Sequence, residues 1–180
     1  MNILLIVFLL SGCSSNASPI INYYDGFAIY MVKQNDGSGW PDFSDINCLP
    51  LEEKPILTDE DIEIYQWNPS MDQMTSGDYK DWNQIVSKDG VNLSERLNDA
   101  GYKGAGIFPF VTVVSGERIY AGYFWVQITS MSTPKGVCVS CMLPVDDDEN
   151  TYVLADNSDK QLLRNKRIYD VMVKKEKLQE

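Results

Sequence analysis

The sequence predicts an α+β fold with a mainly antiparallel sheet, short helices and a C-terminal helix, and three observations support this. Two apolar, β-branched and aromatic runs around a short glycine-containing turn predict a β-hairpin over residues 108–128. Other short apolar runs end at turn-forming residues. Capping residues near position 92 and apolar periodicity after position 165 indicate helices. The chain length suits one domain, which we expect over residues 26–180.

The N-terminal stretch predicts a secretion signal that ends at a modified cysteine. Ile3 to Leu10 is an uninterrupted apolar run, too short to cross a bilayer but typical of a signal-peptide core. The residues Leu10-Ser11-Gly12-Cys13 resemble the lipobox of bacterial lipoproteins, which implies that residues 1–12 are removed and that Cys13 is lipidated. Met1-Asn2 depart from the usual pattern because they contain no Lys or Arg. An ordinary signal peptide with an incidental cysteine is the alternative.

The lipobox resemblance also implies a location. A lipidated Cys13 would anchor the chain to a membrane of the bacterial cell envelope. We then expect residues 13–25 to consist of the lipidated cysteine and a polar, flexible tether. Ser14 is not the Asp that retains some lipoproteins in the inner membrane of Gram-negative bacteria. We therefore expect the outer membrane as the destination in a host with two membranes.

The charge of the chain limits its partners. The formal net charge is −11, and the sequence contains no histidine. An acidic surface is poorly suited to phosphate backbones, so we expect no nucleic-acid partner. For the same reason we expect the membrane to be contacted through the lipid anchor. Without histidine, Ser-His-Asp and Cys-His catalytic sets are excluded.

The first elements are a strand and a helix. Residues 26–33 are nearly all apolar, which predicts a strand that is covered on both faces. The stretch Thr58-Asp59-Glu60-Asp61 predicts the start of a short helix, because a Thr cap precedes several carboxylates. Asn68-Pro69 would stop that helix. A second helix is expected from Leu93 to Asn98, with Asn92 as its cap and Gly101 at its end.

The hairpin carries the strongest structural signal. Ser115-Gly116 supplies its turn, and both faces of the returning strand are apolar, so we expect that strand in the middle of the sheet. Gly122 predicts a bulge or a close approach by another element. The side chains expected to be buried are Phe110, Tyr120, Phe124 and Val126.

The last elements are a further strand and a helix. We expect the strand over residues 137–143 and the helix over residues 165–177. In that helix Tyr169, Met172 and Val173 should share one apolar stripe. Lysines near its end suit the negative end of the helix dipole.

The hairpin also carries a second resemblance. The residues Gly116-Glu117-Arg118-Ile119-Tyr120, followed by Gly122 and Phe124-Trp125, look like a hairpin that recurs in small uncharacterised bacterial lipoproteins and secreted proteins. Residues 55–58 with Asp61-Ile62 are similar to the central segment of those proteins, and residues 167–169 leading to Lys174-Lys175 are similar to their closing helix. The resemblance implies a shared fold family and no particular activity.

Cys138 and Cys141 form a Cys-x-x-Cys motif, which can be a redox site at a helix N-terminus. Here the flanking residues favour a strand, in which residues three apart point to opposite faces. A zinc site would need two more ligands, and only Cys48 remains. We therefore expect a structural role. Either Cys48 forms a disulfide with one of the pair, or Cys138 and Cys141 pair across a local turn.

Two other features of the sequence bear on binding. The acidic run from Asp146 to Glu149 resembles a calcium loop in composition only, because the required Gly and Glu positions do not fit. We therefore expect a solvated acidic turn at this run and no metal site. Because the chain also lacks histidine and recognisable catalytic sets, we expect no cofactor and no catalytic residue. The tryptophans Trp40, Trp67 and Trp82 lie near turn-forming or polar residues, so we expect them to be more exposed than Trp125.

The sequence therefore predicts a lipid-anchored, non-catalytic binding or scaffold module whose partner is an envelope protein or a glycan. A hydrolase that uses paired carboxylates on an envelope glycan is the first alternative. A thiol redox protein that uses Cys138 and Cys141 is the second. Tryptophans flanking a carboxylate-lined cleft would favour a glycan.

Overall fold

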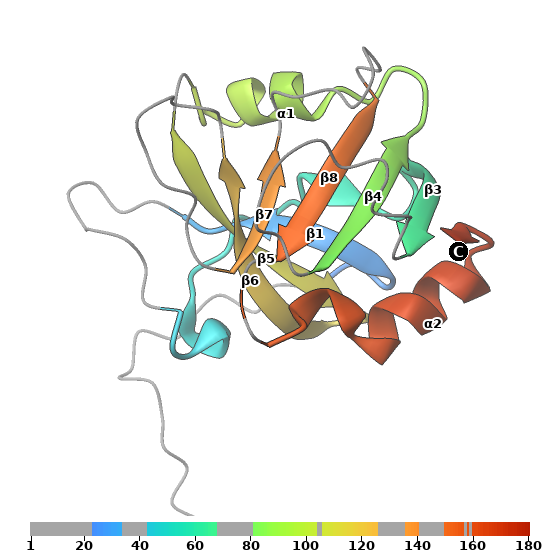
Figure 1. Cartoon of the computed structure of the whole chain (residues 1–180). Coiled ribbons are helices and arrows are strands. Elements are labelled where there is room, and N and C mark those ends of the chain that lie inside the picture. The colour runs from blue at the N-terminus through green and yellow to red at the C-terminus, as the bar shows by residue number, and fades with distance from the viewer. Residues whose placement is uncertain are drawn as a thin grey trace, which may run out of the picture.

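In the described residues the fold consists of two α-helices and a curled sheet (Figure 1). Helix α1 (Leu93–Asp99) and helix α2 (Lys166–Lys174) lie at opposite ends of the sheet. This confirms the α+β class. None of the helices in the described residues is long and apolar enough to span a membrane. The computed structural model describes residues 23–33, 43–67, 81–103, 106–125, 136–140, 150–156, 158 and 160–180.

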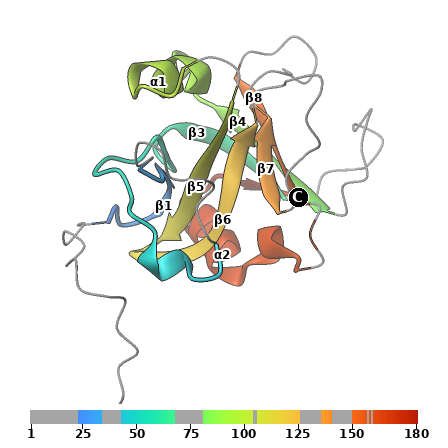
Figure 2. The ribbon, with the colours of Figure 1, turned by 90° about the vertical axis from the view of Figure 1, so that its left-hand side faces the viewer.

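The sheet has nine strands in the order β2-β1-β5-β6-β7-β8-β4-β3-β9. Figure 2 shows β5, β6, β7 and β8 side by side between the two helices. Two short 3-10 helices, η1 (Ile46–Cys48) and η4 (Leu162–Arg164), lie outside the sheet. The strands are β1 (Phe27–Met31), β2 (Leu57–Thr58), β3 (Ile62–Trp67), β4 (Asp81–Ser87), β5 (Ile107–Val114), β6 (Glu117–Trp125), β7 (Val137–Ser140), β8 (Thr151–Asp156) and β9 (Leu178–Gln179).

The sheet is mixed, which corrects the expectation of a mainly antiparallel one. The pairs β6–β7 and β3–β9 are parallel, and the other neighbours are antiparallel. Gly122 of β6 is opposite Val137 of β7, and Trp125 is opposite Ser140. The two strands therefore run in the same direction. Two strands in this relation cannot be joined by a hairpin turn.

The β5–β6 hairpin forms as predicted, and β6 lies in the middle of the sheet. Ser115 and Gly116 both have positive φ angles, the conformation that a tight hairpin turn requires. A Cβ at Gly122 would lie 2.5 Å from Cζ of Phe110, which confirms the predicted close approach. Phe110, Tyr120 and Phe124 are buried as expected, and Val126 lies outside the described residues.

Strand β1 is buried on both faces, which confirms the prediction from its apolar sequence. Phe27, Ile29 and Met31 belong to the main core, which the curled sheet encloses. Ala28 and Tyr30 belong to a second, smaller cluster on the other face.

The helix predicted to start at Thr58 is wrong, because residues 59–61 form a turn between β2 and β3. The backbone N–H and the hydroxyl of Thr58 both donate to Oδ2 of Asp61, at 2.8 and 3.0 Å. These bonds pair the same residue types as a helix capping box, but here they close a turn between strands. Ile62 and Tyr65 are then buried in β3, which pairs with β4.

Both remaining helix predictions are confirmed, with one correction. Asn92 caps α1 through a hydrogen bond from the backbone N–H of Glu95, and Gly101 follows the helix with φ of 92°. Asn165 caps α2, whose buried residues are Ile168 and Met172. Val173 is 48% exposed, so its assignment to the buried stripe is wrong. The buried pair is spaced i, i+4, which turns Val173 away from the core.

Candidate functional site

Several residues singled out in the sequence lie outside the described residues. They include the lipidation candidate Cys13, Cys141 of the Cys-x-x-Cys motif, Trp40, and the acidic run from Asp146 to Glu149.

Two of the predicted cysteines can be placed. Cys48 lies at the end of η1 and takes part in a disulfide bond. Cys138 lies in β7, as expected from its flanking residues, and its side chain is buried. Burial raises the pKa of the Cys138 thiol to about 12, and the nearby carboxylate of Asp156 adds to this. Which cysteine pairs with Cys48 stays a prediction, because Cys141 and Cys13 are not described.

The tryptophans do not follow the predicted order of exposure. Trp82 is only 3% exposed, because it lies within β4 between β8 and β3. Trp67 and Trp125 are both half-buried. The expectation that Trp82 is more exposed than Trp125 is therefore wrong.

A group of polar residues linked by an ion pair and hydrogen bonds lies at the start of β4, next to η4. Arg164 of η4 forms an ion pair with Oδ1 of Asp81. The same guanidinium donates to the Asn83 side-chain oxygen at 2.6 Å and to the Trp82 carbonyl at 3.1 Å. The side chains of Arg164 and Asp81 are 22% and 10% exposed. We call Trp67, Asp81, Asn83 and Arg164 the Asp81 cluster.

Asn83 connects this cluster to the core. Its side-chain amide donates to the Tyr65 hydroxyl at 3.0 Å and to the Leu163 carbonyl at 3.3 Å. Asn83 and Tyr65 are fully buried, as is Leu163. A fully buried amide engaged in this way fixes η4 against the end of the sheet.

Trp67 borders the cluster on β3. The Arg164 guanidinium carbon lies 5.0 Å from the Trp67 ring centroid, within cation–π range. Tyr169 of α2 meets the same indole edge-on, with 5.3 Å between the ring centroids. The ring is thus held in place by a cation and an aromatic neighbour, yet stays partly exposed.

Asp81 is distinctive because only one of its oxygens is used. Oδ2 is buried and has no hydrogen-bond partner among the described residues. Burial raises the pKa of the Asp81 carboxyl more than the ion pair with Arg164 and a hydrogen bond from the Trp82 backbone lower it, and the charge of Asp156 adds to the increase. A buried acceptor without a donor is unfavourable, so it calls for an explanation.

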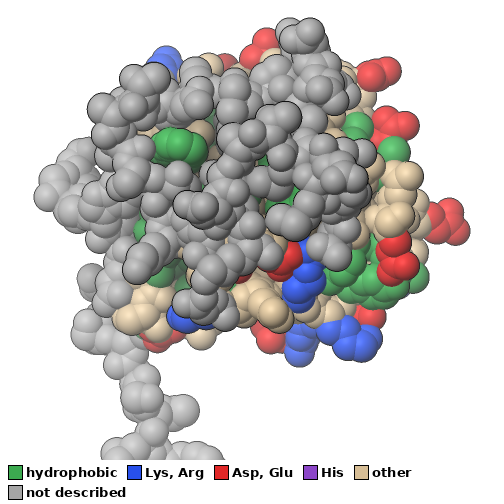
Figure 3. All heavy atoms as spheres, in the orientation of Figure 1, with side chains coloured by type: hydrophobic (Ala, Val, Ile, Leu, Met, Phe, Trp, Pro, Cys, Tyr) green, Lys and Arg blue, Asp and Glu red, His purple; other side chains and the backbone are tan. Residues whose placement is uncertain are grey.

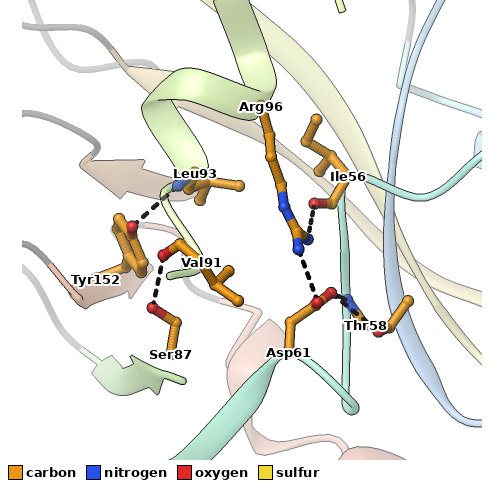
Figure 4. Close-up of polar contacts among 8 residues, drawn as sticks. All are labelled: Ile56, Thr58, Asp61, Ser87, Val91, Leu93, Arg96 and Tyr152. Carbon is orange, nitrogen blue, oxygen red and sulfur yellow. Dashed lines mark hydrogen bonds and ion pairs between the residues drawn. The ribbon is translucent and has the colours of Figure 1, made fainter. Parts of the chain in front are cut away.

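A second Asp–Arg pair lies under α1 and differs in this respect (Figure 4). Arg96 of α1 donates to Oδ1 of Asp61 at 2.8 Å and to the Ile56 carbonyl at 3.1 Å. Thr58 supplies the two donors to Oδ2 of Asp61 described above. Burial alone would raise the pKa of Asp61, but these hydrogen bonds outweigh it, and the pKa lies below its ordinary value.

The remaining contacts in Figure 4 attach α1 to the sheet. The Tyr152 hydroxyl of β8 accepts the backbone N–H of Leu93 at 3.0 Å. The Ser87 hydroxyl of β4 donates to the Val91 carbonyl at 3.1 Å. Both bonds satisfy backbone groups at the start of the helix, so this region is structural.

Asp156 lies opposite Asp81 in the β4–β8 register, and it has a structural role. Its Oδ1 accepts the backbone N–H of Ser158 at 2.8 Å, and its Oδ2 accepts that of Leu162 at 2.9 Å. These bonds position the start of η4 and hence Arg164. Both oxygens of Asp156 are therefore engaged, unlike those of Asp81.

The Asp81 cluster contains a solvent-inaccessible carboxylate oxygen, and its half-buried Trp67 ring contacts Arg164. The described residues contain no group of three or more metal-ligating side chains. Acidic and basic side chains are interspersed over the part of the surface that α2 occupies (Figure 3), so that area forms no patch of one sign. Asp81 and the nearby Asp156 together carry more negative charge than Arg164 balances, which is one cause of the raised pKa of Asp81.

Sequence reasoning missed this cluster. Asp81 and Asn83 lie two residues apart in a strand, which would have placed two polar side chains on the same face. Arg164 is about 80 residues away in the chain and had no recognisable partner. No protein-family model matches the chain, and neither curated proteins nor solved structures gave a significant match.

Proposed function

We propose that the chain is a lipid-anchored lipoprotein of the bacterial cell envelope, whose domain is a non-catalytic binding or scaffold module. Residues 1–12 are the signal peptide, Cys13 carries the lipid, residues 13–25 hold the tether, and residues 26–180 form the domain. The observation that carries this proposal is the lipobox Leu10-Ser11-Gly12-Cys13 directly after an apolar run.

The proposal includes a location and a class of partner. The membrane is contacted through the lipid on Cys13, and in a host with two membranes Ser14 favours the outer one. The partner is an envelope protein or a glycan, and the acidic charge disfavours nucleic acid. The resemblance of the hairpin to other small lipoproteins is consistent with this location.

The environment of Cys138 weighs against the redox alternative. A thiol-disulfide enzyme needs an accessible cysteine that is ionised near neutral pH. Cys138 is buried, and its pKa is raised to about 12, so the thiolate is strongly disfavoured. This supports a structural role for the cysteines.

The anchoring is tested by Cys13→Ala in the native bacterium, grown with a labelled fatty acid. We expect the variant to lose the label and to accumulate as unprocessed precursor. Ser15→Ala, a change two residues away without a thiol, is the matched control and should be labelled normally. Equal labelling and membrane fractionation of the Cys13→Ala and parental chains would refute the lipoprotein proposal.

A glycan hydrolase is a second candidate, favoured by one observation. Asp81 has an unpaired buried oxygen and a raised pKa, which are properties of a general acid. Its neighbour Asp156 is engaged by backbone N–H groups, which weighs against a second catalytic carboxylate there. Release of reducing ends from purified peptidoglycan, lost in Asp81→Asn, would favour the hydrolase over the binding module.

A further inference from the structure

We propose that Arg118 fastens the N-terminal segment to the domain at Tyr23 and Tyr24, so that the free part of the membrane tether ends at residue 22. The inference rests on the proposed lipid anchor, because it defines how far the domain can reach from Cys13. The fastening itself does not require the lipid. Arg118 lies in the hairpin motif Gly116-Glu117-Arg118-Ile119-Tyr120, for which the sequence alone indicates no role.

Arg118 joins three parts of the chain. From the start of β6, its Nε donates to the Tyr23 hydroxyl at 2.9 Å, and its guanidinium carbon lies 5.8 Å from the Tyr23 ring centroid. Its Nη1 donates to the carbonyl of Ile46 in η1 and to that of Leu49, just after η1. A guanidinium presents several donors in one fixed plane, so it can hold the N-terminal segment and η1 against the same strand.

Tyr30 of β1 holds the same segment from a second side. The backbone N–H of Tyr24 donates to the Tyr30 hydroxyl at 2.9 Å. Tyr23 meets the Tyr30 ring edge-on, with 5.6 Å between the ring centroids. Tyr30 is buried in the smaller core cluster, so the segment is attached to a packed strand rather than to a loop.

The β2–β3 turn continues the attachment into β1. The backbone N–H of Phe27 donates to Oδ1 of Asp59 at 3.0 Å. A side chain at Gly26 would collide with Asp59 and with the Tyr24 ring, so the chain runs close against the turn here. Burial raises the pKa of Tyr24, and the charges of Asp59 and Glu60 add to the increase. The fixed part of the chain therefore begins before β1.

The fastening limits how far the domain can move from the membrane. Because Tyr23 is held, residues 13–22 are the longest free tether that the lipid on Cys13 can have, and they span at most about 36 Å. A tether free up to residue 25 would span at most about 47 Å. A partner of the domain must lie within the shorter distance of the membrane plus the width of the domain, about 40 Å.

The fastening is tested by amide hydrogen exchange, measured by NMR on the full chain as the cell makes it, in dodecylphosphocholine micelles. In the parent we expect the Tyr24 amide to exchange at least about tenfold more slowly than in an unstructured chain. The Phe27 amide, which Asp59 holds, is the internal reference.

Two variants remove the bond between Arg118 and Tyr23. Tyr23→Phe deletes only the hydroxyl, and we expect it to speed exchange at Tyr24 about fivefold, the equivalent of one hydrogen bond. Arg118→Met deletes all the donors and should have a larger effect, about tenfold or more. Arg167→Met is the matched control, because Arg167 pairs with Glu117 beside Arg118 and is 58% exposed. It should leave exchange at Tyr24 as in the parent.

Two results would overturn the proposal. One is a parental Tyr24 amide that exchanges as fast as in an unstructured chain, and the other is unchanged exchange at Tyr24 in Tyr23→Phe. Tyr23→Phe leaves the bonds from Arg118 to η1 in place, so the test stands even when Arg118→Met does not fold. Normal lipid labelling of Cys13 without protection of Tyr24 would reject the fastening alone, whereas protection without labelling would reject the lipid anchor alone.

Discussion

The two Asp–Arg pairs, Asp81–Arg164 and Asp61–Arg96, use the same side chains in opposite ways. Asp61 accepts hydrogen bonds at both oxygens, and its pKa is lowered. Asp81 has a donor at one oxygen only, and its pKa is raised. An ion pair alone therefore does not stabilise a buried carboxylate. For Asp61 the hydrogen bonds and the ion pair outweigh burial, whereas for Asp81 burial and the charge of Asp156 outweigh them.

The largest effect is expected from removing the cation of the more buried pair. Arg164→Leu would leave the carboxylate of Asp81 and the side-chain oxygen of Asn83 without their donor at a buried position. We expect a loss of about 3–5 kcal/mol in the free energy of unfolding, measured in urea. Arg96→Leu is the matched comparison and should cost about 1 kcal/mol, because Arg96 is 37% exposed. Equal losses would remove the distinction between the pairs.

A smaller loss is expected from Asp61→Asn. The amide cannot replace both the bond from Arg96 and the two bonds from Thr58 that close the β2–β3 turn. We expect a cost of about 1–2 kcal/mol in urea denaturation. A variant as stable as the parent would mean that the turn does not depend on this carboxylate.

Asp81→Asn should change stability less than Asp61→Asn does. The amide can still accept a hydrogen bond from Arg164, and it removes a buried charge that is only partly compensated. The expected change is within about 1 kcal/mol, which thermal unfolding would detect. A much larger loss would show that the fold depends on the Asp81 carboxylate.

The two carboxylates should also differ in pH dependence. The lowered pKa of Asp61 contributes stability that is present above its unfolded value, about 3.8, and lost as pH falls through the folded pKa. The raised pKa of Asp81 acts oppositely, because its folded state binds the proton more tightly. Its contribution becomes more favourable as pH falls from above its folded pKa toward 3.8. Comparing each Asn variant with the parent from pH 7 to about pH 3 checks both signs. Slopes of the same sign would contradict the comparison.

The predictable parts of the fold were those encoded by nearby residues. The hairpin turn at Ser115-Gly116 and the Asn92 cap depend on local sequence. The close approach at Gly122 was predictable because glycine lies in a strand whose two faces are both apolar. The Thr58 stretch failed because a cap and a turn use the same side-chain bonds. Only the pairing of β3 with β4, which is a tertiary contact, decides between them.

The Asp81 cluster was unpredictable for a related reason. Asp81, Arg164 and Trp67 come from three elements that the sheet order and η4 bring together. The sequence contains 26 acidic residues, so no single one stands out by type. Burial and hydrogen bonding, which distinguish Asp81 from the others, exist only in the folded chain.

The pairing of β1 with β5 has a consequence for how fast the domain folds. Phe27 at the start of β1 is opposite Val114 of β5, and Tyr65 of β3 is opposite Leu178 of β9, so both pairs join distant parts of the chain. Such non-local pairing slows folding, because a long loop must close before the contacts form. We expect a newly made chain to stay unfolded for longer than a helical protein of this size. Such a delay would suit the export before folding that the proposed lipoprotein signal implies.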